Sequence, residues 1–344
     1  MSMQLVESFK KRDDVEINTI ILHSSWQFIG IKTFFFLVTL LWKLPAAIKN
    51  YQPDVILFSS MVTASVLPFM IKKPLVPCVT INHGQDVTLP VAPYQWYLPY
   101  VFKNLKGVIS VSSATKAASV QRGMNEKIGV VLPNGFDKKV ELKLPEKQDA
   151  RAILEEKFKI NLKDKNLILT VGRLVKRKGH QWFIENVIHR IKSDVIYLVV
   201  GDGPEYDRIV NERELSPLKS NIIIAGRQSS DMLNTAYAAA DLFVMPNIPV
   251  EGDMEGFGIV LLEANRAGVP AVASDLEGIK DVIDQGINGY RVPHGEAELF
   301  AQKIDDVLNN ELTELSERAH NYAGENFSWD SVVNKYVSFL KTLN

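Results

Sequence analysis

Short runs of apolar, mostly β-branched residues alternate along the chain with amphipathic stretches. The runs lack the polar alternation of a half-exposed strand, which indicates strands that are covered on both faces. Regular alternation of such strands with helices predicts parallel, doubly wound sheets and therefore an α/β fold. The predicted strands are Ile17–Leu22, Asp54–Ser59, Leu75–Ile81, Gly107–Val111, Ile128–Leu132, Leu167–Val171, Val195–Val200, Asn221–Ala225, Leu242–Met245 and Ala271–Ala273.

A polar stretch, DKKVELKLPEKQ over residues 137–148, interrupts this alternation. Because compositional breaks of this kind mark linkers, we expect two domains, over residues 1–139 and 140–327. Residues 328–344 form a further predicted helix. Two domains also suit a chain of 344 residues.

The first domain begins unusually for a doubly wound fold, which normally opens with a strand and a glycine-rich turn. Here the first predicted element is a helix, Met3–Lys11, and the strand Ile17–Leu22 follows it. The first strand is missing from the pattern. Either upstream residues are absent from this sequence or the first domain is reduced.

The longest apolar stretch is TFFFLVTLLW over residues 33–42. Ten residues fall short of the roughly 20 that a membrane-spanning helix needs. One interpretation is a helix buried between the sheet and its neighbours. The other is a helix that dips into a membrane face, flanked by Lys32, Lys43 and Lys49.

Composition narrows the class of protein. With 46% hydrophobic and 23% charged residues the chain is an ordinary globular protein rather than a disordered one. Its single cysteine, Cys78, excludes an internal disulfide framework and a cysteine zinc cage, and favours the reducing cytoplasm. The net charge of −1 gives no reason to expect a nucleic-acid partner.

The overall charge hides an asymmetry. Residues 1–137 carry 13 Lys and Arg against 8 Asp and Glu, a net of +5, whereas the remainder has a net of −6. A basic first half is compatible with an anionic lipid surface or an anionic ligand, and equally with solvated lysines.

A basic, glycine-containing segment, VGRLVKRKG over residues 171–179, follows a predicted strand. Glycine at a strand end allows a tight turn, and ligands bind at this end of an α/β sheet. The fork of Arg173 and the point charge of Lys178 suit a diphosphate. Four basic residues within six positions are also typical of a solvated loop.

A second segment, EGFGIVLLE over residues 255–263, follows the strand that ends at Met245. We expect Glu255 in the loop and Glu263 in a helix that begins near Gly258. The N–H groups of Gly256 and Gly258 would then lie at a helix N-terminus, which favours anions. Carboxylates can bind sugar hydroxyls, although a helix with an acidic residue nearby is common in any case.

Three weaker segments also follow predicted strands. TINHGQD over residues 80–86 places His83 and Asp86 at the carboxyl end of a strand, but a single histidine is usually structural. LPNGFD over 132–137 and GDGP over 201–204 are most simply turns.

Together and in this order, these segments resemble the retaining glycosyltransferases of the GT-B fold, usually called family 4. The resemblance runs from about residue 3 to the end and is most specific in the second half, where order and spacing both match. The residues that carry it are His83–Gly84, VSSAT at 111–115, PNGFD at 133–137, VGR at 171–173, Lys178–Gly179, GDGP at 201–204, YAAAD at 237–241, EGFG at 255–258, Glu263–Ala264 and GVPAV at 268–272.

The resemblance implies two Rossmann-like domains that face a cleft. Residues 1–139 would form the acceptor-side domain, which lacks its first strand, and residues 140–327 the nucleotide-sugar domain. The last helix, within 328–344, would return to the first domain.

The same resemblance implies a role for each matched residue. The catalytic set would be His83 beside the sugar, Arg173 and Lys178 on the donor diphosphate, and Glu255 on the donor sugar. Glu263 would bind the ribose hydroxyls. The remaining donor contacts would come from Gly172, Gly256, Phe257, Gly258 and Ile259.

The implied function is retaining transfer of a hexose from a nucleoside diphosphate sugar to a hydroxyl of a glycan or lipid-linked acceptor, in cell-surface polysaccharide synthesis. No cofactor or metal is expected, because Arg173 and Lys178 can supply a metal's electrostatic role. The partners would be the donor, the acceptor and a membrane surface. We therefore expect a cytoplasmic enzyme at the inner face of the membrane.

At two places the sequence departs from the family pattern, so other functions are also considered. The family's first strand and its Gly-Gly loop have no match, and DLEGI at residues 275–279 replaces a Gly-Gly-x-Pro-Glu run. A non-catalytic nucleotide-sugar-binding or partner protein of the same fold is the main alternative. An epimerase or a phosphorylase of this fold is a third.

Overall fold

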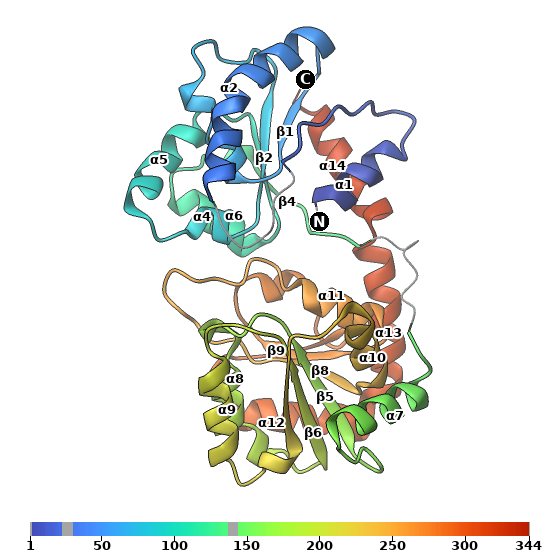
Figure 1. Cartoon of the computed structure of the whole chain (residues 1–344). Coiled ribbons are helices and arrows are strands. Elements are labelled where there is room, and N and C mark those ends of the chain that lie inside the picture. Colours follow the sequence, from blue (N-terminus) through green and yellow to red (C-terminus); the bar gives the residue numbers. More distant parts are fainter. Residues whose placement is uncertain (1, 23–29, 137–143, 344) are drawn as a thin grey trace. The chain divides into compact units, whose positions relative to one another are not determined.

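A computed structural model describes residues 2–22, 30–136 and 144–343 (Figure 1). The chain divides into two compact units. Unit 1 comprises residues 1–137 and 329–344, and unit 2 comprises residues 138–328. Each unit contains its own parallel sheet, so the predicted α/β class is confirmed.

Unit 1 is built on four parallel strands in the order β1-β2-β3-β4. These strands are β1 (Ile56–Phe58), β2 (Cys78–Asn82), β3 (Gly107–Ser110) and β4 (Gly129–Val131). Its helices are α1 (Ser2–Lys10), α2 (Ile31–Tyr51), α3 (Met61–Ala64), α4 (Gln85–Thr88), α5 (Ala92–Phe102), α6 (Ser113–Gln121) and α14 (Trp329–Lys341), with short 3₁₀ turns η1 (Leu67–Phe69) and η2 (Glu126–Ile128).

The expected strand at Ile17–Leu22 is wrong. These residues pair with no strand in the described part of unit 1, and their side chains are exposed or only half-buried. A β-branched run becomes a strand only where a sheet edge and a packing surface receive it. The strand expected from Leu75 begins instead at Cys78, after Pro77, and Leu75 is fully exposed.

Helix α2 is longer than the apolar stretch that predicted it. It continues through Pro45 to Tyr51 and ends at Gln52, which has a left-handed φ of 45°. Only Leu40 and Leu44 are fully buried along its 21 residues. The interpretation of a buried helix is therefore wrong.

The two ends of the chain meet within unit 1, where α14 packs against α1. Phe9 and Tyr336 pack edge to face, with their ring centroids 6.5 Å apart. The Trp329 backbone N–H donates to the Phe136 carbonyl at 2.9 Å. Phe339 packs so closely on the start of β3 that a Cβ on Gly107 would lie 2.9 Å from its ring.

Unit 2 contains six parallel strands in the order β10-β9-β8-β5-β6-β7. They are β5 (Asn166–Val171), β6 (Val195–Val200), β7 (Ile222–Gly226), β8 (Leu242–Met245), β9 (Ala271–Ser274) and β10 (Gly289–Val292). The strand order reverses between β5 and β8, because β6 and β7 are added on one side of β5 and β8, β9 and β10 on the other. In open α/β sheets, ligands bind beyond the carboxyl ends of the strands at this point.

Helices cover both faces of this sheet. They are α7 (Lys147–Phe158), α8 (His180–Asn186), α9 (Tyr206–Leu215), α10 (Ser230–Ala239), α11 (Ile259–Arg266), α12 (Ala297–Asp306) and α13 (Leu312–Asn326), with shorter turns η3 (Lys176–Lys178), η4 (Ile188–Arg190), η5 (Lys219–Asn221), η6 (Glu277–Asp281) and the π-helical η7 (Val307–Glu311).

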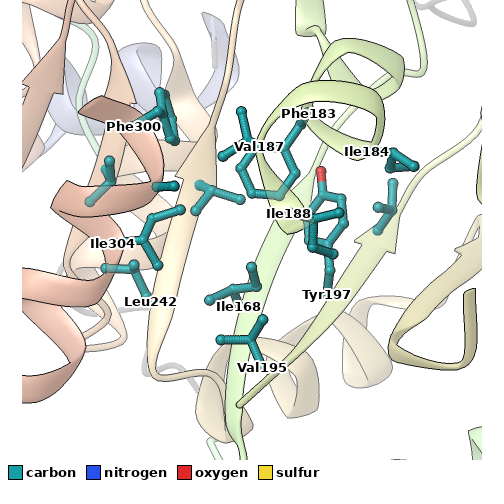
Figure 2. Packing of buried hydrophobic residues seen from close by; sticks show 14 of the residues in the cluster. Ile168, Phe183, Ile184, Val187, Ile188, Val195, Tyr197, Leu242, Phe300 and Ile304 are labelled. Carbon is teal, nitrogen blue, oxygen red and sulfur yellow. The ribbon is translucent and has the colours of Figure 1, made fainter. Parts of the chain in front are cut away.

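The core of unit 2 fixes α8 onto the sheet (Figure 2). Phe183 of α8 lies 4.7 Å from Tyr197 of β6 and 5.9 Å from Phe300 of α12, measured between ring centroids. All three side chains are fully buried. Because α8 directly follows the loop after β5, this packing gives that loop a rigid base.

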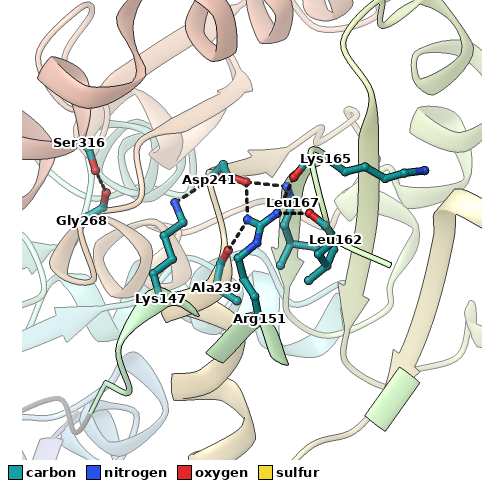
Figure 3. A network of polar contacts seen from close by, with 9 residues as sticks. All are labelled: Lys147, Arg151, Leu162, Lys165, Leu167, Ala239, Asp241, Gly268 and Ser316. Carbon is teal, nitrogen blue, oxygen red and sulfur yellow. Dashed lines mark hydrogen bonds and ion pairs between the residues drawn. The ribbon is translucent and has the colours of Figure 1, made fainter. Parts of the chain in front are cut away.

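A polar network secures the opposite, amino-terminal edge of β5 and β8 (Figure 3). The Asp241 carboxylate accepts from the Leu167 backbone N–H at 2.6 Å and pairs with Lys147 at 2.6 Å and with Arg151 at 3.1 Å. Arg151 also donates to the carbonyls of Leu162 and Lys165. Asp241 therefore ties α7 to the sheet, a structural role at the edge away from the ligand-binding side.

Candidate functional site

The loop that leaves β5 carries the basic residues expected to hold a phosphate. Arg173 is exposed, and among the described residues no carboxylate forms an ion pair with its guanidinium. Lys178, at the end of η3, is only 6% exposed. Its side chain lies over Gly172, where an added Cβ would be 3.7 Å from the lysine Cε. Both cations thus lie at the carboxyl end of β5.

Gly179 brings this loop against the loop that follows β8. Its φ is 67°, and a Cβ there would lie 1.9 Å from the carbonyl oxygen of Pro246. Only glycine allows both this conformation and this approach. A backbone hydrogen bond from Ile248 to the Arg177 carbonyl, 2.9 Å long, joins the two loops beside it.

The contact between these loops is a buried ion pair. The Lys178 Nζ lies 2.6 Å from Oε2 of Glu255, which is itself only 7% exposed. Arg177 Nη2 lies 3.7 Å from the same oxygen, and the Asn247 amide donates to it at 3.3 Å. Burial opposes ionisation of Glu255, but Lys178 and Arg177 outweigh it and hold the Glu255 pKa below its usual value.

The backbone of Glu255 is fixed by the segment 275–279. The Glu255 N–H donates to the Glu277 carboxylate, and the Gly278 N–H donates to the Glu255 carbonyl at 3.1 Å. Glu277 adopts a left-handed φ of 48°, which is uncommon for this residue type. Burial raises the pKa of Glu277 above its usual value. Glu277 of this segment thus supplies a contact that positions Glu255.

Helix α11 begins directly after this loop. Gly258, its N-cap, has a φ of 75° and offers no side-chain cap, so the first N–H groups of the helix point beyond its end. Gly256 and Phe257 are buried, whereas Ile259 is exposed. A helix N-terminus of this kind favours an anion.

Glu263 lies one turn into α11 and is exposed. Its Oε2 accepts from the Tyr237 hydroxyl of α10 at 2.9 Å, so this carboxylate has a fixed orientation. Burial and the neighbouring Glu263 raise the pKa of Tyr237 well above its usual value, and the phenol stays protonated as a donor.

His83 belongs to unit 1 and follows β2. Its Nε2 lies 2.9 Å from the carbonyl oxygen of Ser59. Because a carbonyl only accepts, Nε2 must carry the proton, which leaves Nδ1 unprotonated in the neutral ring. The Asp86 carboxylate accepts from the backbone N–H groups of His83 at 2.8 Å and Met61 at 3.0 Å, and so positions the histidine.

The structure therefore brings together, within unit 2, most of the residues that the sequence suggested. Three further residues of the cluster were not predicted as site residues: Arg177, Asn247 and Glu277. The sequence held two signals for them: Arg177 directly precedes Lys178, and Asn247 lies just after β8. Within the described ranges, no group of three or more His, Cys, Asp or Glu side chains is placed to hold a metal ion.

Comparisons with known protein families match both units. Residues 153–326 match the family described as glycosyl transferases group 1, and residues 5–140 match glycosyltransferase family 4. Among curated proteins, the chain is 32% identical over 179 residues to the lipopolysaccharide core biosynthesis glycosyltransferase LpsE of Rhizobium meliloti, covering 52% of this chain and 50% of LpsE.

A second relative is the GDP-mannose-dependent alpha-(1-6)-phosphatidylinositol monomannoside mannosyltransferase of Mycobacterium tuberculosis. It is 25% identical over 199 residues, which cover 56% of this chain and 51% of the relative. The chain thus spans about half the length of the curated relatives it matches.

Among solved structures, that of Anabaena Alr3699/HepE in complex with UDP is similar, with a TM-score of 0.74 and 19% identity. The aligned residues cover 89% of this chain and 82% of the HepE chain. This similarity supports the expected GT-B type of fold.

Proposed function

The chain belongs to the group 1 glycosyl transferases of glycosyltransferase family 4, and from that premise we propose that it transfers a hexose from a nucleoside diphosphate sugar to a hydroxyl of a glycan or lipid-linked acceptor. The anomeric configuration of the sugar is retained. The reaction belongs to cell-surface polysaccharide synthesis, and it takes place in the cytoplasm. The glycan-building relative LpsE supports this assignment.

One observation carries the proposal: cationic groups and a helix N-terminus converge at the switch point between β5 and β8. Positive groups stabilise a diphosphate, and Arg173 is exposed there, with no carboxylate partner among the described residues. Lys178 has three donors, and its pair with Glu255 uses one of them. We assign the diphosphate to Arg173, Lys178 and the amides at the start of α11.

The bond changes follow from this placement. The bond between C1 of the sugar and the diphosphate oxygen breaks, the acceptor oxygen bonds to C1, and the proton of the acceptor hydroxyl passes to the departing diphosphate. Charge builds up on the leaving nucleoside diphosphate, so a fixed cation beside it lowers the barrier. In this proposal Glu255 and the buried Asn247 face the sugar, Glu263 binds the ribose, and His83 of unit 1 serves the acceptor side.

The test measures thermal unfolding of the wild type with UDP, GDP and ADP. A nucleotide at 100 times its dissociation constant stabilises the folded state by about 2.7 kcal/mol, which for a unit of this size corresponds to roughly 5–10 °C. We expect one nucleotide to produce this shift in the wild type and in Arg208→Ala, a control on α9. Arg173→Ala should lose it. The shift should be followed by turnover of the matching nucleotide sugar.

The outcomes separate the alternatives. An equal shift in Arg173→Ala would refute the phosphate site. A shift without turnover of any sugar conjugate, with acceptor present, would instead support a nucleotide-sugar-binding protein that does not catalyse transfer.

A further inference from the structure

The outer side of α2 is apolar although it faces solvent. Its inner side contributes Leu40, Leu44 and four partly buried neighbours to the core of unit 1. Ile31, Phe34, Phe35 and Trp42 point the other way and are 61–77% exposed. At 100° per residue these four fall on one face of the helix. Surface helices normally carry polar residues there, so an apolar outer face indicates an interaction site.

Lysines border this apolar face, and acidic residues are missing from it. Lys32, Lys43 and Lys49 are all exposed on α2. Between residues 17 and 125 the chain has nine Lys and Arg against only two acidic residues, Asp54 and Asp86. Asp86 is engaged with backbone N–H groups.

A second part of unit 1 repeats the combination. Phe69, Ile71 and Leu75 are strongly exposed around Lys72 and Lys73. Phe69 stacks on Tyr97 of α5, and that helix exposes Trp96 and Tyr100. Of the eighteen exposed large hydrophobic side chains in the described ranges, thirteen lie in unit 1.

We propose that the outer face of α2, defined by Ile31, Phe34, Phe35, Trp42 and its three lysines, docks unit 1 onto a lipid bilayer that contains anionic headgroups. Aromatic side chains at the level of the headgroups and lysines that reach the phosphates are the composition of an interfacial helix. The proposal does not depend on the glycosyl transfer proposed above.

The structure favours a helix that lies in the interface over one that crosses the bilayer. By length and hydropathy alone α2 could span a membrane. However, its inner face is part of a protein core that includes Phe58 of β1, and Lys43 lies near its middle. A second copy of the chain is a poor occupant, because a two-fold contact would bring lysines of both α2 helices together.

The experiment measures sedimentation of the full chain with vesicles of pure phosphatidylcholine and with vesicles containing 30% phosphatidylglycerol. We expect binding to the anionic vesicles that weakens at high salt. The triple variant Phe34→Ser, Phe35→Ser, Trp42→Ser should bind about tenfold more weakly or worse. Replacing Lys32, Lys43 and Lys49 by Gln should cost on the order of 100-fold on anionic vesicles.

Matched controls separate docking from misfolding. Leu215→Ser changes a 79% exposed apolar residue of unit 2 and should bind like the wild type. The single variant Trp42→Ser keeps the test usable if the triple variant fails to fold. Glu255→Gln should bind vesicles normally even if nucleotide binding is lost.

Three results would overturn the proposal. One is wild-type sedimentation no better with anionic vesicles than without lipid. Another is unchanged binding of the folded triple or Trp42 variant. The third is a dimer without lipid that the Trp42 variant dissociates, since a second copy would then be the occupant.

Discussion

The buried pair of Lys178 and Glu255 gives the most direct test of the site's energetics. Lys178→Met removes the ammonium and keeps an unbranched side chain of similar length, and Glu255→Gln removes the charge of the carboxylate. At neutral pH the Glu255 carboxylate is ionised in the wild type, because its pKa is held below its usual value. Each single variant therefore leaves a buried charge without its main partner.

The structure sets the expected size of these effects. Removing one member of a buried pair costs about 3–5 kcal/mol. After Lys178→Met, Glu255 keeps Arg177 at 3.7 Å and the Asn247 amide at 3.3 Å, so we expect about 3 kcal/mol. After Glu255→Gln, Arg177 keeps Asp253 at 3.6 Å and the nearby Glu277, but Lys178 has no other ion pair among the described residues, so this variant should cost more.

Calorimetric unfolding provides the measurement. For a unit of this size, 1 kcal/mol shifts the melting temperature by roughly 2–4 °C, so Lys178→Met should lower the unit 2 transition by about 6–12 °C. The double variant should fall no further than Glu255→Gln, which corresponds to a coupling of about 3 kcal/mol. A double variant whose loss equals the sum of the two single losses would refute the reasoning, since the side chains would then act independently.

Three further predictions concern unit 2, each measured by its melting temperature. Burial, with a smaller effect of Lys178, lowers the pKa of His180 to about 3. The neutral His180 therefore stabilises unit 2 fully above the unfolded pKa near 6.5. As pH falls below that value the free energy of unfolding decreases, by about 2 kcal/mol at pH 5. His180→Gln should flatten this acid slope relative to the wild type, and an unchanged slope would contradict it. Gly179→Ala should destabilise unit 2 far more than Gly226→Ala, because an added Cβ at position 179 would clash with the Pro246 carbonyl. Gly226 has a similar φ but open space around it, so Gly226→Ala should cost only about 1–2 kcal/mol. Equal losses in the two variants would contradict the clash at position 179. Asp241→Asn should cost about 3 kcal/mol, because two cations lose their partner, and a change below about 1 kcal/mol would show the network to be weak.

Most of the fold could be predicted because parallel strands buried on both faces appear as continuous apolar runs. Nine of the ten predicted strands exist, two of them with the predicted bounds and seven with shifted ends. The strand β10 was missed, because GYRV is short, contains an arginine and lies at a sheet edge. Ile17–Leu22 has the composition of a strand, but no strand of the described ranges lies beside it, and composition alone does not reveal the partner.

The site shows a similar limit. The sequence identified Lys178 and Glu255 separately, each from its place after a strand. It could not show that they form an ion pair, because the contact depends on β5 and β8 being neighbours although two strands separate them along the chain. Glu277 was hidden for the same reason, as its contact with Glu255 depends on where η6 returns. The catalytic and binding roles assigned to these residues stay predictions.

The packing of α14 on α1 has a consequence for how the protein is made. Unit 2 is continuous in sequence, whereas unit 1 is completed only by α14, which follows unit 2 along the chain. Because synthesis proceeds from the N-terminal side at about 5–20 residues per second, α1 is made long before the helix that covers it. Unit 1 therefore cannot complete its packing until all of unit 2 has been synthesised. A premature stop shortly before Trp329 would yield a folded unit 2 attached to an unfinished unit 1, with Phe9 left without Tyr336.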